Sequence, residues 1–418
     1  MSENLQDNQC CVVIGASHAG VNFAFALRKA GWLGKIILID KDPELPYHRP
    51  PLSKVALALH ANEEAQPLKP KESYQNEHIE LQLGREVVTI NKDERKIVLD
   101  NSEVINFDKL IIATGGRALL PSIKGMDSTP NVYTMRTAAD AVRIRESVHK
   151  SELKRVVIIG GGYIGLEVAA SLRKRGCTVS LLERESRLLP RVTSPHISDF
   201  FTETHTANGV SLFTEKNVVS MSSQNGNTEV ICEDGTTFSA DLVVVGVGIR
   251  VNMELAIEAG LEAKNGIKVD EKCQTSEDGI YAIGDCCCHF SQRYQRWIRL
   301  ESVQNAVDQA KIAAAVICGN ETPAEPFPWF WSDQYEHKLQ MVGLSEGYNE
   351  CIVREEVGDD IKFSVWYFEG DKLLAVDAVN NARAYVVGTK LLKEKRIINK
   401  LNLQDPSTEL KPLNIIAE

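Results

Sequence analysis

The apolar residues of this chain form one pattern that occurs twice within its 418 residues. In the first copy, an apolar run at 11–14 leads into the turn GASHAG at 15–20, and a helical stretch reaches Ala30. A second apolar run at 35–40 ends on the acid Asp40. Short apolar runs bounded by turn residues are typical of buried strands. The first copy therefore predicts a strand, a glycine turn, a helix and a second strand.

The second copy repeats this order of elements. An apolar run at 156–159 is followed by GGGYIG at 160–165, a helix to about Arg175, and a strand at 178–183 that ends on Glu183. A strand, a glycine turn, a helix and a strand begin a dinucleotide-binding fold. Two copies in one chain therefore predict sites for two nucleotides.

Each half of the chain also has a later strand that ends in small residues, at 110–116 and at 242–248. Small residues at the end of a strand can bring the backbone near a bound nucleotide or mark a crossing between domains. A further short strand at 279–285 is predicted to end on Asp285, and a long helix is predicted over 303–318.

The last part of the chain has a different character. Prolines at 323, 326 and 328 indicate a linker, and alternating segments beyond it, such as 361–368 and 373–379, predict strands. We therefore expect an α/β protein with two Rossmann-like dinucleotide-binding domains and a small C-terminal α+β domain.

Composition excludes some classes of partner and compartment. The formal net charge of −10 argues against a general binder of nucleic acid or of acidic membranes.

The polar start MSENLQDNQ lacks the features of a signal peptide, and no apolar stretch has the length of a membrane span. The ten cysteines include the contiguous runs 10–11 and 286–288 and no CxxC pair, which indicates reduced thiols in a cytoplasmic protein and no metal site.

The second glycine motif gives each glycine a task. Gly160 permits the tight turn, Gly162 lets backbone N–H groups approach a pyrophosphate, and Gly165 lets the helix lie close to the strand. The helix N-terminus adds partial positive charge for the phosphates. Glu183 can accept hydrogen bonds from a ribose 2′-hydroxyl and would repel a 2′-phosphate, so NADH is expected over NADPH. Arg184 could partly accommodate a phosphate or could be a solvated surface charge.

The first motif is less regular because Ser17 replaces the middle glycine. Serine is small enough to keep the close approach to phosphate. His18 is interpreted as a helix-start residue that faces solvent or cofactor, in preference to a catalytic base.

Several segments are highly specific: LPYHRPPLSK at 45–54, RLESVQNA at 299–306, PWFWSDQ at 328–334, GDC at 284–286 and LSEGY at 344–348. With these segments and both glycine motifs, nearly the whole chain resembles the ferredoxin reductases of bacterial oxygenase systems. The resemblance implies a glutathione-reductase-like fold in which an NAD domain is inserted into an FAD domain, and a C-terminal domain covers the flavin. It also implies a ferredoxin–NAD(+) reductase that takes a hydride from NADH and reduces a [2Fe–2S] ferredoxin serving a P450 or Rieske oxygenase.

On this basis residues 1–115 and 248–325 are assigned to the FAD domain, 116–247 to the NAD domain and 326–418 to the C-terminal domain. The resemblance implies FAD contacts at Ala19, Lys54, Val87, Arg136, Asp285 and Val303, with Arg49 in the RPPLSK pattern added. The family usually has an acid at the position of Lys41, so the contact to the adenosine ribose is made by either Asp40 or Lys41. The full set expected at FAD is Gly15, Ser17, His18, Ala19, Gly20, Asp40, Lys41, Arg49, Lys54, Val87, Ala113, Thr114, Gly115, Arg136, Gly284, Asp285, Ser302, Val303 and Trp331. The set expected at NAD(H) is Gly160, Gly162, Tyr163, Ile164, Gly165, Glu183, Arg184, Arg191 and Gly248.

Similar reductases place a lysine and a glutamate near the flavin N5, and Lys54 and Glu167 are the candidates here; the alternative is a surface ion pair. The helix that begins near Ser302 is expected to direct its positive end at the flavin pyrimidine. Trp331 is a candidate for packing near the flavin, and Trp297 for lining the electron exit.

Three other functions are weighed. A disulfide reductase or peroxide-reducing oxidase would need a cysteine near the flavin, but residues 42–60 contain none, and residues 286–288 are interpreted as small apolar positions. A rubredoxin reductase, and an NADH-binding signalling flavoprotein similar to apoptosis-inducing factor, stay open. A ferredoxin is expected to dock on basic residues, for which the candidates are Lys311, Lys338, Lys390 and Lys393.

Overall fold

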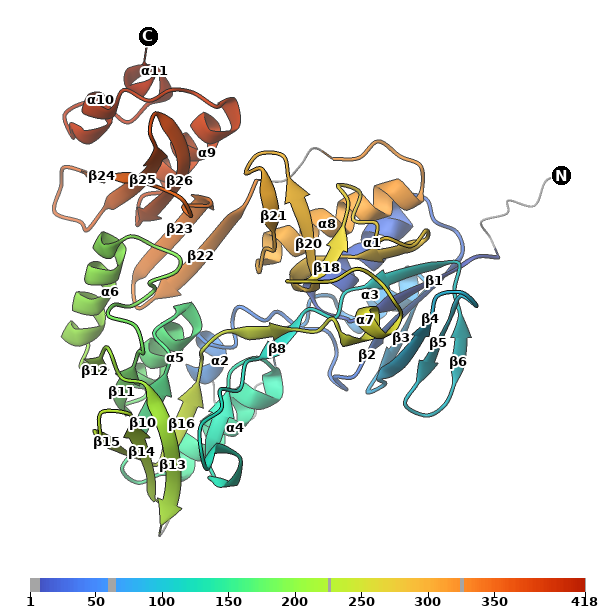
Figure 1. Ribbon diagram of the computed structural model, residues 1–418, viewed down its shortest axis with the longest axis horizontal. Helices are drawn as coiled ribbons and strands as arrows, with labels where there is room; N and C mark the ends of the chain where they lie inside the picture. The colour runs from blue at the N-terminus through green and yellow to red at the C-terminus, as the bar shows by residue number, and fades with distance from the viewer. Residues whose placement is uncertain (1–7, 59–64, 225–226, 324–326, 418) are drawn as a thin grey trace. The chain divides into compact units, whose positions relative to one another are not determined.

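The computed structural model describes residues 8–58, 65–224, 227–323 and 327–417 (Figure 1). Contacts within the chain divide it into two compact units, each built from three segments. The first unit consists of Met1–His48, Ala65–Arg117 and Ile249–Pro326. The second unit consists of Arg49–Glu64, Ala118–Gly248 and Phe327–Glu418. The RPPLSK segment therefore belongs to the second unit, together with the second glycine motif and the C-terminal sheet.

The first unit is built around a five-stranded parallel sheet with the strand order β19-β7-β1-β2-β3. These strands are Ile280–Ala282 (β19), Lys109–Ile112 (β7), Cys10–Ile14 (β1), Lys35–Asp40 (β2) and Ile79–Leu83 (β3). Both faces of the sheet are covered, as is usual for a parallel sheet. The continuous apolar run of β1 follows from this burial on both sides.

Helices cover one face of this sheet and strands cover the other. Helices α1 (His18–Lys29) and α8 (Val303–Ile317) pack together, with Cys11 and Val13 of β1 in their core. Val12 and Ile14 lie in the core of the opposite face. Side chains of the antiparallel sheet β4 (Val87–Asn91), β5 (Lys96–Leu99) and β6 (Val104–Asn106) complete that second core. The remaining elements of the first unit are α3 (Lys71–Asn76), α7 (Glu254–Glu258), β18 (Ile267–Val269), β20 (Cys287–Ser291) and β21 (Arg296–Ile298).

A two-stranded ribbon marks the place where the chain leaves and re-enters the first unit. Strand β8 (Gly116–Ala118) pairs with β17 (Ile249–Val251). A Cβ atom on Gly116 would lie 2.7 Å from Cδ1 of Ile249 and 3.0 Å from the carbonyl oxygen of Arg250, so a larger residue there would require Ile249 to move. Next to the ribbon, Nδ2 of Asn252 donates to the carbonyl of Thr114 over 2.9 Å.

The second unit contains a parallel sheet with the order β12-β11-β10-β16-β9. These strands are Val210–Phe213 (β12), Thr178–Leu182 (β11), Arg155–Ile159 (β10), Leu242–Val245 (β16) and Val132–Thr134 (β9). The accompanying helices are α2 (Val55–Ala58), α4 (Ala138–Lys150), α5 (Tyr163–Lys174) and α6 (Pro195–Ala207). An antiparallel sheet of β13 (Val218–Gln224), β14 (Asn227–Cys232) and β15 (Thr237–Ala240) packs beside them, as Figure 1 shows in green.

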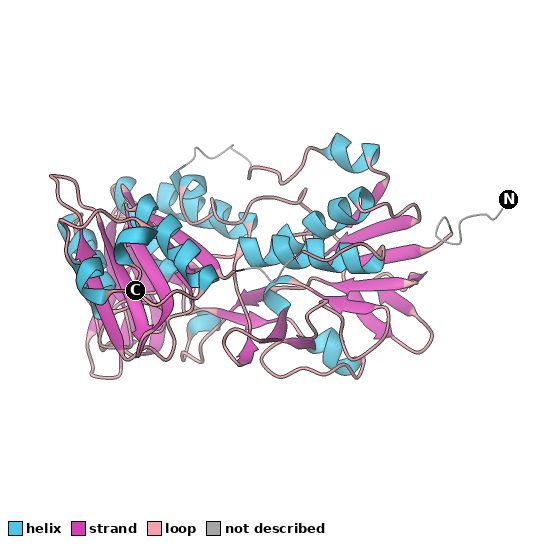
Figure 2. Ribbon diagram, turned by 90° about the horizontal axis from the view of Figure 1, so that it is seen from above, coloured by secondary structure: helices cyan, strands magenta, loops and turns pink. Residues whose placement is uncertain are grey.

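The C-terminal part of the second unit is a five-stranded antiparallel sheet with the order β22-β23-β26-β25-β24. Its strands are Trp329–Gln334 (β22), His337–Gly343 (β23), Lys372–Val379 (β26), Phe363–Glu369 (β25) and Glu350–Glu355 (β24). Figure 2, in which strands are magenta, shows these strands side by side near the C-terminus. Helices α9 (Ala382–Glu394), α10 (Lys400–Gln404) and α11 (Pro412–Ile415) share a core with this sheet.

The expected α/β fold with a C-terminal α+β part is confirmed, and one local expectation is wrong. Asp285 does not end a strand: β19 stops at Ala282, and Gly284 to Cys286 form a 3₁₀ turn. The reason is Gly284, whose φ of +79° is incompatible with an extended strand. His18 begins α1 as expected, and its ring lies 5.6 Å from that of His48. Because the side chain is buried, it does not face solvent, and the alternative that it faces a cofactor stays a prediction.

Among the described residues, no helix is both long enough and apolar enough to cross a membrane.

Candidate active site

The glycine turn of the first unit brings α1 against β1 so closely that side chains are excluded. Gly15 has a φ of +106°, and a Cβ atom on it would lie 2.3 Å from the carbonyl oxygen of Ala113. A Cβ on Gly20 would lie 1.9 Å from the carbonyl oxygen of Gly15. No side chain fits at either distance, so both positions require glycine.

The turn of the second unit has the same geometry. Gly160 has a φ of +109°, and a Cβ on Gly165 would lie 2.0 Å from the carbonyl oxygen of Gly160. Gly162 is different: it is the N-cap of α5, and the position of its missing Cβ is open space. The geometric tasks of Gly160 and Gly165 are therefore confirmed. The open position at Gly162 beside a helix N-terminus fits a diphosphate, whose binding there stays a prediction.

Each turn is also joined to the acid at the end of the neighbouring strand. Oδ2 of Asp40 accepts a hydrogen bond from the backbone N–H of Ala16 over 2.5 Å, and Oε2 of Glu183 accepts one from Gly161 over 2.6 Å. The second oxygen of each carboxylate accepts from the amide two residues further along, over 2.9 Å in both cases. The two units therefore hold an acid at the same place relative to a glycine turn.

The basic candidates Lys41, Arg184 and Arg191 are exposed, and the ion pairs that the described residues show for them lead to other acids than Asp40 and Glu183. The ammonium of Lys41 is 3.6 Å from Glu86, and about two thirds of the side chain is exposed, at 67%. Arg184 is also exposed and pairs with Glu185 over 2.9 Å. Arg191 is exposed as well. Of the pair Asp40 and Lys41, the structure places Asp40 at the turn.

Lys54 and Glu167 lie together in the second unit. Nζ of Lys54 is 2.9 Å from Oε2 of Glu167, and the side chain of Glu167 is only 3% exposed while that of Lys54 is 20% exposed. Ser53 Oγ donates to the same oxygen over 2.5 Å, and Ser332 Oγ donates to Oε1 over 2.7 Å. The interpretation as a surface ion pair is therefore wrong, because a buried carboxylate needs these donors to offset its desolvation.

Sequence reasoning missed Ser53 and Ser332 as partners of the pair. Both stand in segments that the resemblance had singled out, RPPLSK and PWFWSDQ. A second omission is Gln309 of α8, whose Oε1 accepts from the backbone N–H of Gly284 over 2.7 Å. The expected start of α8 is confirmed: Ser302 is its N-cap and accepts from the N–H of Asn305 over 3.1 Å.

The remaining candidates lie in both units. Ser17, Ala19, Val87, Ala113, Thr114, Gly115, Asp285 and Val303 are in the first unit, and Arg49, Arg136, Tyr163, Ile164, Gly248 and Trp331 are in the second. Within the second unit, Nη1 of Arg49 donates to the carbonyl of Arg136 over 3.2 Å. The rings of Trp331 and Trp329 are 5.5 Å apart. In the first unit, Trp297 is half exposed and packs on Phe290 with Lys268 over its ring.

Cys286, Cys287 and Cys288 are buried, and burial raises the pKa of each thiol above its usual value. Their interpretation as small apolar residues fits this burial. None of the ten cysteines, all in the described part of the chain, forms a disulfide. Within the described ranges, no cluster of histidine, cysteine or acidic side chains has the arrangement of a metal site.

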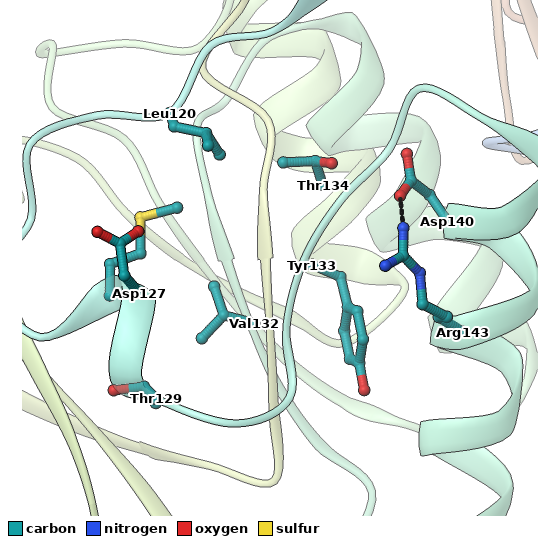
Figure 3. A pocket seen from close by; sticks show the side chains of 9 residues that line it. Leu120, Asp127, Thr129, Val132, Tyr133, Thr134, Asp140 and Arg143 are labelled. Carbon is teal, nitrogen blue, oxygen red and sulfur yellow. Dashed lines mark hydrogen bonds and ion pairs between the residues drawn. The ribbon is translucent and has the colours of Figure 1, made fainter. Parts of the chain in front are cut away.

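An open pocket of about 260 Å³ lies on the second unit beside β9 and α4 (Figure 3). No candidate residue lines it. Of the two acids that line it, Asp127 and Asp140, Asp140 is already engaged, because Oδ1 accepts from Arg143 over 2.7 Å and the backbone amides of Arg136 and Thr137 donate to Oδ2. This carboxylate caps α4, and we do not assign the pocket to a cofactor.

Comparisons with known proteins agree with this geometry. Residues 10–310 match the family described as pyridine nucleotide-disulphide oxidoreductase, and residues 329–414 match the family described as reductase C-terminal. Putidaredoxin reductase CamA of Pseudomonas putida is 42% identical, over 99% of this chain and 98% of that protein.

Two solved structures are similar over nearly their whole length. One is a covalent complex of putidaredoxin reductase with putidaredoxin, with a TM-score of 0.90 and 41% identity over 96% of this chain and 97% of that one. The other is the ferredoxin reductase for the CYP199A2 system of Rhodopseudomonas palustris, with a TM-score of 0.92 and 36% identity over 97% and 100%. The resemblance that the sequence motifs carried is confirmed, and the chain belongs to the pyridine nucleotide-disulphide oxidoreductase family.

Proposed function

We propose that this chain is an FAD-dependent reductase that takes a hydride from NADH and passes electrons singly to a [2Fe–2S] ferredoxin of an oxygenase system. The main support for this proposal is a hydrogen bond that occurs in both units, between the backbone of a glycine turn and the acid at the end of the next strand. This arrangement is typical of a dinucleotide site, so each unit is expected to bind one nucleotide. The similarity to putidaredoxin reductase and to the reductase of the CYP199A2 system supports the acceptor. The ten cysteines without disulfides support a cytoplasmic location.

In the proposed NADH site, the second unit binds the coenzyme at the N-terminus of α5. The open position at Gly162 admits the diphosphate, and the α5 dipole favours its negative charge. Glu183 then accepts hydrogen bonds from the adenosine ribose and repels a 2′-phosphate. Arg184 is paired with Glu185, so it adds little attraction for a phosphate.

In the proposed FAD site, the first unit binds the nucleotide at the turn between β1 and α1. Asp40 is the acid for the adenosine ribose, because it lies against the turn while Lys41 is directed to Glu86. The N-terminus of α8, capped by Ser302, contributes partial positive charge to the site. FAD supplies the chemistry that the side chains cannot, because it accepts two electrons as a hydride and releases them one at a time.

We assign to Lys54 the task of orienting and polarising the flavin edge. An ammonium on a four-carbon side chain is mobile unless it is held. Glu167 holds it over 2.9 Å, and the buried position of this carboxylate strengthens their attraction relative to a pair in water. Lys54 thus presents its positive charge from a fixed position.

The test is a reconstitution with purified components. The protein should bind one FAD and, with NADH, reduce cytochrome c rapidly only when a [2Fe–2S] ferredoxin is added. Reduction through an added rubredoxin but not through the ferredoxin would assign the chain to rubredoxin reductases. Tight NADH binding without turnover of either carrier would instead support a signalling flavoprotein, and either result overturns the proposal.

A further inference from the structure

A buried chain of hydrogen bonds leads away from Glu167 inside the second unit. Ser332 Oγ lies 2.7 Å from Oε1 of Glu167, and Nε2 of Gln334 lies 3.2 Å from Ser332 Oγ. Oε1 of Gln334 is 2.8 Å from Nε2 of His205. Lys54 lies at the other end, 2.9 Å from Oε2 of Glu167. The chain therefore joins the RPPLSK segment, α5, β22 and α6.

Three members of this chain are completely shielded from water. Ser332, Gln334 and His205 are each 0% exposed. Ser332 and Gln334 point to the same side of β22 because side chains two residues apart in a strand share a face. This alternation explains Ser332 and Gln334 in PWFWSDQ: an apolar residue at either position would leave a buried neighbour without its partner.

The charge on Glu167 fixes the direction of every hydrogen bond in this chain. An ionised carboxylate has no proton to donate, so the hydroxyl of Ser332 must donate to it. A hydroxyl has one proton, so Ser332 must accept from the amide group of Gln334. The carbonyl of Gln334 then faces His205, which must donate to it through Nε2.

The state of His205 agrees with this direction. Burial lowers the pKa of His205 to about 4, so its ring is neutral near pH 7 and carries one proton. Nδ1 of His205 is buried and has no hydrogen-bond partner among the described residues, whereas Nε2 faces Gln334. A proton on Nε2 satisfies Gln334, and a proton on Nδ1 would leave both groups unsatisfied.

We propose that Ser332 and Gln334 are positioning residues for the Lys54 ammonium, which they hold through Glu167 in a one-directional hydrogen-bond chain that begins at His205. The inference rests on the proposed function, because it assumes that Lys54 acts at the flavin. It gives the C-terminal sheet a part in hydride transfer: β22 fixes one oxygen of Glu167, so that the other stays directed at Lys54. Ser53 shares that second oxygen over 2.5 Å.

The first test is a double-mutant cycle on the rate of flavin reduction by NADH in anaerobic stopped-flow experiments. Ser332→Ala removes a hydrogen bond to a charged group and should slow reduction about five- to twentyfold with unchanged FAD content. In the Lys54→Met background, where no ammonium is left to position, Ser332→Ala should change the rate by less than about twofold.

Ser364→Ala is the matched control. Ser364 is also a completely buried serine of the C-terminal sheet, and it accepts a hydrogen bond from Trp366 over 2.9 Å. The Ser364→Ala variant should lower the midpoint of thermal unfolding about as much as Ser332→Ala does, and it should leave the rate of flavin reduction unchanged. Two results would overturn the positioning role. One is a double variant whose rate of flavin reduction falls by the product of the factors for Ser332→Ala and Lys54→Met. The other is a Ser364→Ala variant that slows flavin reduction as much as Ser332→Ala does.

The second test does not depend on activity. Nitrogen-15 labelling of the nine histidines, with His205→Gln to assign the signal, reports which ring nitrogen of His205 is protonated. We expect the proton on Nε2, and a faster exchange of this proton with solvent in Gln334→Met. Ser364→Ala should leave the signal in place. A proton on Nδ1 would reverse the chain and overturn the inference.

These experiments distinguish a failure of the proposed function from a failure of the positioning inference. If NADH reduces the flavin of the unaltered protein but no ferredoxin accepts the electrons, the proposed function fails and the cycle still decides the inference. If Lys54→Met leaves flavin reduction unchanged, Lys54 is not at the reacting edge and the positioning inference fails, whatever the acceptor.

Discussion

Glu183 accepts a hydrogen bond from the backbone N–H of Gly161 over 2.6 Å, which holds its carboxylate against the second glycine turn. We predict that Glu183→Ala narrows the preference for NADH over NADPH. A hydrogen bond to a charged group is worth ~1.5–3 kcal/mol, so kcat/KM for NADH should fall by roughly one to two orders of magnitude. Steady-state kinetics with both coenzymes measure the change.

Asp40→Ala is the control for this experiment, because Asp40 makes the same bond to the first turn over 2.5 Å. It should weaken the retention of FAD and leave the ratio of kcat/KM for the two coenzymes unchanged. Equal use of NADH and NADPH by the unaltered protein would contradict the assignment of Glu183.

Lys54→Met should slow flavin reduction by NADH, or weaken FAD binding, more than it lowers stability. The side chain keeps its length and loses the charge that Glu167 holds over 2.9 Å. Stopped-flow reduction and flavin content measure the effect, and Lys124→Met, at an exposed lysine of the same unit, is the control. If rate and flavin content both stay at the level of the unaltered protein, Lys54 has a structural role.

The thiols at 286–288 should take no part in turnover. Burial raises their pKa values, so few thiolates form at pH 8 and reaction with a thiol reagent should be slower than at the partly exposed Cys351. The number of reactive thiols should be the same with and without NADH. Two additional thiols after reduction would indicate a disulfide-reducing enzyme.

Asp377 should make stability depend on pH. Burial raises the pKa of this carboxyl from 3.8 to about 7, so between these values the folded protein keeps a proton that the unfolded chain releases. The free energy of unfolding therefore falls as pH rises from about 4 to about 7, by up to ~4 kcal/mol. Asp377→Asn should remove much of this slope in denaturant titrations. Asp360→Asn, at an exposed position, should retain it, and equal slopes in all three proteins would contradict the prediction.

A basic contact with the ferredoxin should make electron transfer sensitive to salt. Lys311 on α8 is exposed, and Lys311→Glu should raise the apparent KM for ferredoxin about two- to fivefold while the KM for NADH stays unchanged. High salt should slow ferredoxin reduction more than ferricyanide reduction, because the Debye length falls from ~10 Å at 0.1 M to ~3 Å at 1 M. Lys71→Glu makes the same charge change on α3 and is the control. Equal slowing with both acceptors would exclude the docking role.

The parts of the molecule that the sequence predicts well are those set by local geometry. Gly15 and Gly160 stand where the backbone needs a positive φ and no side chain fits, so the turns, the strands before them and the helices after them follow from short segments. The bond from Glu183 to its turn follows from the same unit, because the parallel pairing of β10 with β11 brings the two strand ends together.

Contacts between distant segments could not be predicted in this way. Ser332 reaches Glu167 across 165 positions of sequence, and His205 reaches Gln334 across 129. Such pairs depend on how β22 packs on α5 and α6, which no local pattern encodes. The sequence left open whether His18 faces solvent or cofactor for a similar reason, because its burial depends on packing beside His48.

The ribbon of β8 and β17 has a consequence for how such a protein can diverge. Because the chain leaves the first unit at Arg117 and returns at Ile249 through two paired strands, the ends of the intervening segment are neighbours. Segments with adjacent ends can be exchanged by a single recombination without separating the strands on either side. If NADH binds at the N-terminus of α5 as proposed, the residues that select the reductant lie on this one segment, and the segment can be replaced while the sheet of β1, β2 and β7 stays unchanged.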